Sequence, residues 1–174
     1  MNRSNQYASG KARGWYFSDI ETLLYESHGI VLGQASADSC VAACCRMLLH
    51  DEGIEQPEAF IRDALDLDEG GYVSRIPDIL RAFGSRASYE YRNDLTTDDL
   101  KQVVQRGPAV VFLKRPRDRF GHALLVEEFS GNLIGVRDPL PEGEGAAYRI
   151  PSDDFLKLWL NDGTGRGQAA IVVK

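Results

Sequence analysis

Residues 33–53 read GQASADSCVAACCRMLLHDEG, and this stretch decides how the first half of the chain is organised. Small polar residues lead into a run of small and apolar residues, which stops at a glycine. The pattern predicts a helix over about residues 40–51, with Asp38 or Ser39 as its N-cap. Cys40 is then the first residue of that helix.

Four further helices are predicted in the first half. Proline opens one of them and a Thr/Asp cap with an acidic first turn opens another, and their apolar residues recur at helical intervals. They span about residues 18–26, 57–67, 75–84 and 96–107. The first half is therefore expected to be mostly helical.

The second half changes to the pattern of strands. Four short segments are rich in β-branched residues and are bounded by Gly, Pro or Asn, with a hairpin turn expected at 129–133. The segments are PAVVFLK (108–114), HALLVEEF (122–129), NLIGVRD (132–138) and AAIVVK (169–174). A loop is expected at 139–148 and a helix at 151–160. Helices followed by an antiparallel sheet indicate the α+β class.

Length and charge restrict the class of protein. The chain has 174 residues, 43% hydrophobic and 26% charged, which suits one globular domain over residues 15–174 after a loose arm at 1–14. Its net charge is −6, whereas nucleic-acid binders usually carry a basic surplus. Nucleic acid is therefore not an expected partner.

Targeting signals are not evident in the sequence. The longest apolar runs fall far short of the roughly 18 residues that a membrane span needs, and the N-terminus has no apolar core of a classical signal peptide. We expect a cytoplasmic protein, or one delivered into a target cell by a specialised secretion system, with no membrane partner. A domain cut from a longer polypeptide would give the same pattern.

The three cysteines are predicted to be reduced. They lie on one predicted helix at positions i, i+4 and i+5, where Cys44 and Cys45 are adjacent and poorly placed to form a disulfide. A second pair of metal ligands with zinc-site spacing is absent from the sequence. Neither a metal nor another cofactor is expected.

Four residues could form a nucleophilic site. Cys40 at a helix N-terminus would have a stabilised thiolate, because the helix dipole and free N–H groups favour negative charge there. His122 begins one predicted strand and Asp138 ends the next, so a hairpin would place a base and its orienting group at one sheet edge. Gln34, six residues before Cys40, could donate to an oxyanion.

Two other histidines compete less well for the role of base. His28 precedes Cys40 in the chain, and His50 ends the helix that Cys40 begins, roughly 15 Å away at 1.5 Å per residue. We therefore predict that His122 is the base.

The same residues resemble a known family. Gln34 and Cys40 in QASADSCVAACCRMLL, His122 in GHALLVEE and Asp138 in VRDPLP are similar to the Gln, Cys, His and Asp of papain-like cysteine peptidases. The pattern is closest to the bacteriocin-processing double-glycine leader peptidases, in which a Gln likewise lies six residues before a Cys that opens a helix. The resemblance covers about residues 30–174, including the late Trp-containing helix SDDFLKLWL.

The resemblance implies a papain-like two-lobe fold, with an N-terminal helical lobe, a C-terminal antiparallel sheet lobe and the active site between them. It also implies a bacterial thiol protease that hydrolyses a peptide bond after a Gly-Gly pair, so the expected partner is a protein or peptide substrate. Standalone domains of this size further resemble toxin or effector domains of bacterial toxins. Such domains act inside a competitor and are blocked by a cognate immunity or inhibitor protein.

Other interpretations of these residues stay open at this point. The same triad can carry out glutamine deamidation or acyl transfer, because a thioester forms equally well from a side-chain carboxamide. An inactive peptide-binding module is a further alternative. Cys44 and Cys45 are interpreted as core residues, and Gly70-Gly71 as a helix stop rather than a cleavage site.

Overall fold

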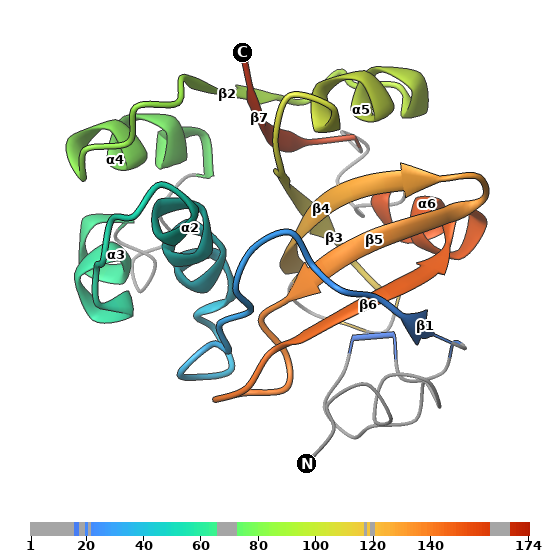
Figure 1. Cartoon of the computed structure of the whole chain (residues 1–174), viewed down its shortest axis with the longest axis horizontal. Coiled ribbons are helices and arrows are strands. Elements are labelled where there is room, and N and C mark those ends of the chain that lie inside the picture. The colour runs from blue at the N-terminus through green and yellow to red at the C-terminus, as the bar shows by residue number, and fades with distance from the viewer. Residues whose placement is uncertain are drawn as a thin grey trace.

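The computed structural model describes residues 16–17, 20, 22–65, 73–116, 118, 121–160 and 168–174. The predicted arm at 1–14 and the Gly70-Gly71 pair lie outside these residues. Within them the chain forms helices on both sides of a single twisted sheet (Figure 1). The helices of this part of the chain are too short and too polar to cross a bilayer.

Five of the six predicted helices form where the sequence predicts them, with small differences at their ends. They are α2 (Cys40–Asp51), α3 (Glu58–Leu65), α4 (Ile76–Ala82), α5 (Thr97–Val104) and α6 (Ser152–Leu160), and a 3₁₀ turn, η2 (Val73–Arg75), precedes α4. Thr96 and Asp99 form a reciprocal capping box at the start of α5. Ser39 occupies the N-cap position of α2, but its hydroxyl donates to Ser36 O (3.0 Å) instead of capping the helix.

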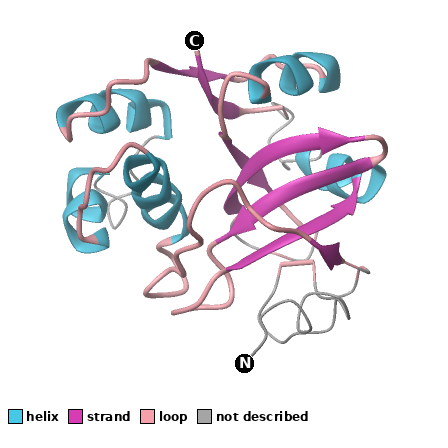
Figure 2. Cartoon of the chain, viewed as in Figure 1, coloured by secondary structure: helices cyan, strands magenta, loops and turns pink. Residues whose placement is uncertain are grey.

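The sheet is antiparallel throughout and has seven strands in the order β1-β6-β5-β4-β3-β7-β2 (Figure 2). Adjacent strands pair in antiparallel register, and a β-bulge interrupts β4 against β5 between Val126 and Glu128. The strands are β1 (Leu23–Leu24), β2 (Tyr89–Arg92), β3 (Ala109–Leu113), β4 (His122–Ser130), β5 (Leu133–Asp138), β6 (Ala146–Pro151) and β7 (Ala170–Val173). The α+β class is confirmed.

Three expectations about local structure were wrong or incomplete. The helix predicted at 18–26 is not formed in its described part, where β1 pairs with β6. The loop predicted at 139–148 ends earlier, because β6 begins at Ala146. Strand β2, which pairs with β7, was not predicted from the sequence. For β1 and β2, pairing with a strand far away in the sequence outweighs local propensity, whereas β6 begins at Ala146 because that residue pairs with Asp138 of the preceding strand.

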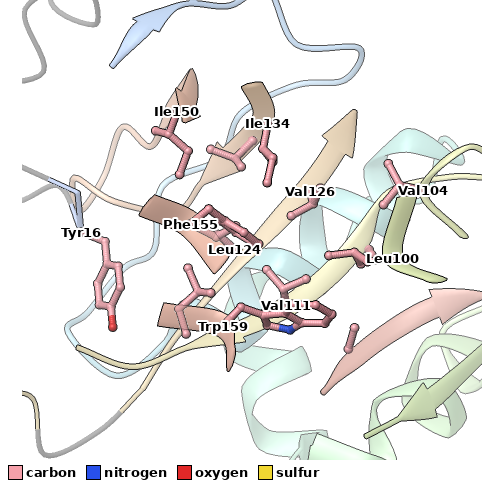
Figure 3. Close-up of a cluster of buried hydrophobic side chains, with 14 of the residues drawn as sticks. Tyr16, Leu100, Val104, Val111, Leu124, Val126, Ile134, Ile150, Phe155 and Trp159 are labelled. Carbon is pink, nitrogen blue, oxygen red and sulfur yellow. The ribbon is translucent and has the colours of Figure 1, made fainter. Parts of the chain in front are cut away.

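Two hydrophobic clusters cover the two faces of the sheet. On one face α2, α3 and α4 pack against Val110, Ala123 and Leu125. On the other face α5 and α6 pack against alternate residues of the same strands, with Trp159 and Phe155 of α6 fully buried (Figure 3). This packing places α2 beside β4.

Candidate active site

His122 and Asp138 form a buried hydrogen-bonded pair. The first residue of β4 and the last residue of β5 meet at one end of the hairpin, where His122 Nε2 lies 2.7 Å from Asp138 Oδ1. Asp138 also accepts from the Tyr148 hydroxyl (2.6 Å to Oδ2) and from the backbone N–H of Leu140 (2.9 Å to Oδ1). Both carboxylate oxygens therefore have partners that fix their direction toward the imidazole.

Cys40 lies against the other side of the histidine. As the first residue of α2 it is 9% exposed, and its side chain is hydrogen-bonded to His122, which is 6% exposed. Since His122 Nε2 faces Asp138, Nδ1 is the ring nitrogen left for the sulfur. Cys40, His122 and Asp138 thus form one continuous chain of interactions, brought together from three separate elements.

The electrostatics of the group favour an ion pair. Burial alone would raise the pKa of Cys40, but the hydrogen bond and positive charge of His122 outweigh it and lower that pKa below its usual value. For His122, burial acts to lower the pKa, while Asp138 and Cys40 together raise it to about 10. At neutral pH the arrangement therefore favours a thiolate beside an imidazolium.

Gln34 lies near this group through its backbone. Its N–H donates to Pro139 O (2.9 Å), and its carbonyl accepts from Gly143 N (3.0 Å), so it is tied to the segment that follows Asp138. A Cβ at the preceding Gly33 would lie 2.3 Å from Glu144 N, so this close approach requires glycine. The Gln34 side chain is buried, and its Nε2 donates to Ser36 O (2.6 Å).

Helix α3 holds the loop between Gln34 and Cys40, a role that the sequence did not indicate. The buried carboxylate of Glu58 accepts from the backbone N–H of Ala35 (3.1 Å). Arg62, one turn further along α3, donates to the Ser36 hydroxyl and to Asp38, each at 2.8 Å. Two side chains of α3 thus fix the loop that leads into Cys40.

An ion cluster lies directly beside Asp138. The preceding residue, Arg137, is fully buried and pairs with Glu127 (2.5 Å) and with Asp51 at the end of α2 (2.6 Å). Glu127 also accepts from the Tyr25 hydroxyl (2.7 Å) and from the backbone N–H of His28 (2.9 Å). Strand β5 therefore anchors the far end of α2 as well as His122.

Cys44 lies one helical turn after Cys40, and Cys45, His28 and His50 have surroundings of their own. Cys44 and Cys45 are fully buried free thiols; burial raises the pKa of Cys44, and that of Cys45 to about 12. His28 lies 3.6 Å from Glu128, and His50 lies 2.9 Å from Glu55. Among the described residues we found no group of three His, Cys, Asp or Glu side chains that could hold a metal ion.

Comparison with solved structures identifies the fold. No protein-family pattern matches the sequence, and no curated protein matches it. Several solved structures do match. One is a double glycine motif protease from an AMS/PCAT transporter, in complex with the leader peptide. Its TM-score is 0.57 and its sequence identity is 18%, and the match covers 84% of this chain and 92% of the protease chain. The chain has the fold of the double-glycine peptidases. The α+β, papain-like architecture expected from the resemblance is thereby confirmed.

Two more structures with the double-glycine peptidase fold support this assignment. The peptidase domain of Streptococcus ComA, a bifunctional ABC transporter involved in a quorum-sensing pathway, has a TM-score of 0.55 and 20% identity over 82% of this chain and 96% of that one. A C39-like peptidase from Bacillus anthracis has a TM-score of 0.61 and 15% identity over 85% and 98%. The similarity therefore extends over nearly the whole of each related domain.

The three thiols are expected to differ sharply in reactivity. With iodoacetamide near pH 6, Cys40 should be alkylated faster than an ordinary thiol, because its lowered pKa leaves a larger fraction of it ionised. Cys44 and Cys45 should stay unmodified in the folded protein, since both are buried and protonated. Mass spectrometry of the alkylated peptides measures each rate. A Cys40 that titrates near pH 8.5, like a free thiol, would contradict the ion pair.

Proposed function

We propose that this protein is a cysteine peptidase with Cys40 as nucleophile, His122 as acid and base, Asp138 as orienting group and Gln34 as oxyanion donor. The observation that carries the proposal is the unbroken chain from Cys40 through His122 to Asp138, at the N-terminus of a helix in a double-glycine peptidase fold. A thiol, an imidazole and a buried carboxylate in this order are the parts of a cysteine nucleophile.

In the proposed reaction the Cys40 thiolate attacks the carbonyl carbon of the scissile amide. The carbon–sulfur bond forms as the carbonyl π electrons move to oxygen, which becomes an oxyanion. The imidazolium of His122 then protonates the leaving amine as the C–N bond breaks, which leaves a thioester. Neutral His122 takes a proton from water, and the hydroxide attacks the thioester. The C–S bond then breaks, which restores the thiolate beside the imidazolium, and the carboxylic acid product loses its proton to solvent.

Gln34 would stabilise the oxyanion together with the backbone N–H of Cys40. An amide NH₂ group carries two hydrogens, and Gln34 Nε2 gives only one of them to Ser36 O. The second hydrogen can serve a developing negative charge. Because Glu58 and Arg62 hold the loop in place, the donor would need little reorganisation during the reaction.

The burial of Cys40 and His122 supports a preference for glycine next to the scissile bond. Cys40 is 9% exposed and His122 is 6% exposed, and glycine, which has no side chain, lets a peptide backbone approach such buried groups most closely. One of the similar structures is a double glycine motif protease crystallised with a leader peptide. We therefore propose a protein or peptide substrate that is cleaved after Gly-Gly.

Peptides of matched sequence test this proposal. A peptide with an internal Gly-Gly pair should be cleaved after the second glycine, and the same peptide with Ala-Ala should be cleaved at least about 10-fold more slowly. New termini are identified by mass spectrometry, and the Cys40→Ala variant is the control. Cys40-dependent release of ammonia from a glutamine substrate, without a new terminus, would instead indicate a deamidase. Binding without turnover would indicate a peptide-binding module.

A further inference from the structure

Tyr16 lies on the imidazole of His122, far from it in sequence. The two rings are stacked, with centroids 4.8 Å apart and planes at 26°. Tyr16 is 5% exposed and lies at the edge of the hydrophobic cluster in Figure 3, apart from Phe155 and Trp159 of α6. The side chain thus covers the one residue that connects Cys40 to Asp138.

The neighbouring Phe17 covers the other side-chain partner of Asp138. Its ring meets that of Tyr148 edge-on, with centroids 6.2 Å apart, and it is 1% exposed. Tyr148 in turn donates to Asp138 Oδ2. Tyr16 and Phe17 therefore shield both side chains that bind the carboxylate, which keeps water from the hydrogen bond between His122 and Asp138.

Arg115 fixes Tyr16 in this position. The backbone N–H of Arg115 donates to the Tyr16 hydroxyl (2.7 Å), and its Nη1 donates to Tyr16 O (3.1 Å). Its guanidinium carbon lies 4.4 Å from the Tyr16 ring centroid, and Asp118 accepts from its Nε (2.7 Å). Arg115 follows β3, whose last residue, Leu113, pairs with His122. The end of β3 thus holds both groups: His122 through strand pairing and Tyr16 through Arg115.

From these contacts we infer that Tyr16 is a positioning residue for His122. The Tyr16 ring holds the plane of the imidazole and stabilises the protonated form of His122. This role deepens the proposed peptidase function and rests on it for any effect on turnover. The face of an aromatic ring attracts a cation, most strongly where water is excluded. Burial raises the pKa of Tyr16 itself to about 12, so the ring stays neutral over the working range.

Several other groups act on the same imidazole and must stay constant in any test. Asp138 on β5 and Cys40 on α2 contact it directly. Tyr148 on β6 and Cys44 on α2 act through Asp138 and Cys40. Arg115 and Asp118 act on Tyr16. Substitution at Tyr16 alone keeps all six side chains, although in Tyr16→Leu and Tyr16→Met Arg115 loses its contacts with the hydroxyl and the ring.

The test compares Tyr16→Leu and Tyr16→Met, which keep an apolar cover, with Tyr16→Phe, which keeps the ring. In the first two, the pH midpoint of Cys40 alkylation should rise by about 0.5 to 1 unit, because the imidazolium loses its aromatic partner. The ring ¹⁵N shifts of His122 should show deprotonation at correspondingly lower pH. With the Gly-Gly peptide, kcat should fall roughly 10-fold with KM nearly unchanged. Tyr16→Phe should resemble the unmodified protein in all three measurements.

Tyr25→Leu is the matched control, because Tyr25 is a buried tyrosine whose hydroxyl also has one strong partner, Glu127. It should destabilise the protein without moving either titration. The positioning role would be overturned if folded Tyr16→Leu and Tyr16→Met gave the same alkylation midpoint and ¹⁵N titration as the unmodified protein. It would also be overturned if Tyr16→Phe or Tyr25→Leu shifted these titrations as much as Tyr16→Leu does. Alkylation and ¹⁵N shifts need no turnover. If the unmodified protein cleaves nothing but the titrations move, the proposed function fails and the positioning role stands.

Discussion

Replacing His122 with alanine is expected to reduce peptide hydrolysis at least about 10⁴-fold, the scale seen when one member of a catalytic triad is removed. Two effects act together. The proposed proton carrier is lost, and the pKa of Cys40 should rise, because burial then acts on the thiol without the opposing imidazolium. Initial rates with the Gly-Gly peptide measure the first effect, and the pH dependence of Cys40 alkylation measures the second.

His50→Ala is the matched control for that substitution. His50 lies at the opposite end of α2 from Cys40, and its Nε2 lies 2.9 Å from the exposed Glu55. Its removal should leave both the rate and the Cys40 titration unchanged. If His122→Ala retained a tenth of the activity, or if His50→Ala lost as much, the assignment of the base to His122 would be wrong.

Replacing Arg137 with alanine is expected to lower the free energy of unfolding by about 3 to 5 kcal/mol, the usual cost of removing one partner of a buried ion pair. Arg137 is fully buried between Glu127, which is also buried, and Asp51. Without the guanidinium, the Glu127 carboxylate keeps only its bonds from Tyr25 and the His28 backbone. Urea denaturation of the variant measures the loss.

Arg149→Ala serves as the comparison for Arg137→Ala. Arg149 pairs with Glu128 at 2.8 Å, but both side chains are partly exposed, so the loss should be within about 1 kcal/mol. Arg137→Ala should also slow catalysis in the folded fraction, because Asp51 connects Arg137 to the helix that carries Cys40. Equal stability losses in the two variants would show that burial of the Arg137 cluster has little energetic weight.

The helices were predictable because their signals are local. The run of small residues before α2, the Thr96 capping box and the glycine after α2 depend on a few neighbouring residues. Strands β1 and β2 were missed because they form only by pairing with β6 and β7, which lie far away in the sequence. Strand β6 opens with two alanines, which carry no β-branched signal at the end of the predicted loop.

Contact between Cys40, His122 and Asp138 followed from residue type and chain order, since a hairpin must bring His122 and Asp138 to one end. The surroundings could not be predicted in the same way. Tyr16 and His122 are 106 positions apart in the sequence but stack in the structure. No short sequence motif predicts such a contact. The surroundings of Arg137 were equally unpredictable. Alternation along β5 predicts which face of the sheet the side chain lies on, but not which helix covers that face.

The most direct test of the central claim is a comparison of new protein N-termini in a bacterial lysate treated with the protein or with its Cys40→Ala variant. The peptidase proposal predicts new termini that appear only with intact Cys40, and these should follow Gly-Gly pairs. His122→Ala should abolish the same termini, whereas His50→Ala should not. If no terminus depends on Cys40 while the protein is folded and its Cys40 is reactive toward iodoacetamide, the protein is not a peptidase.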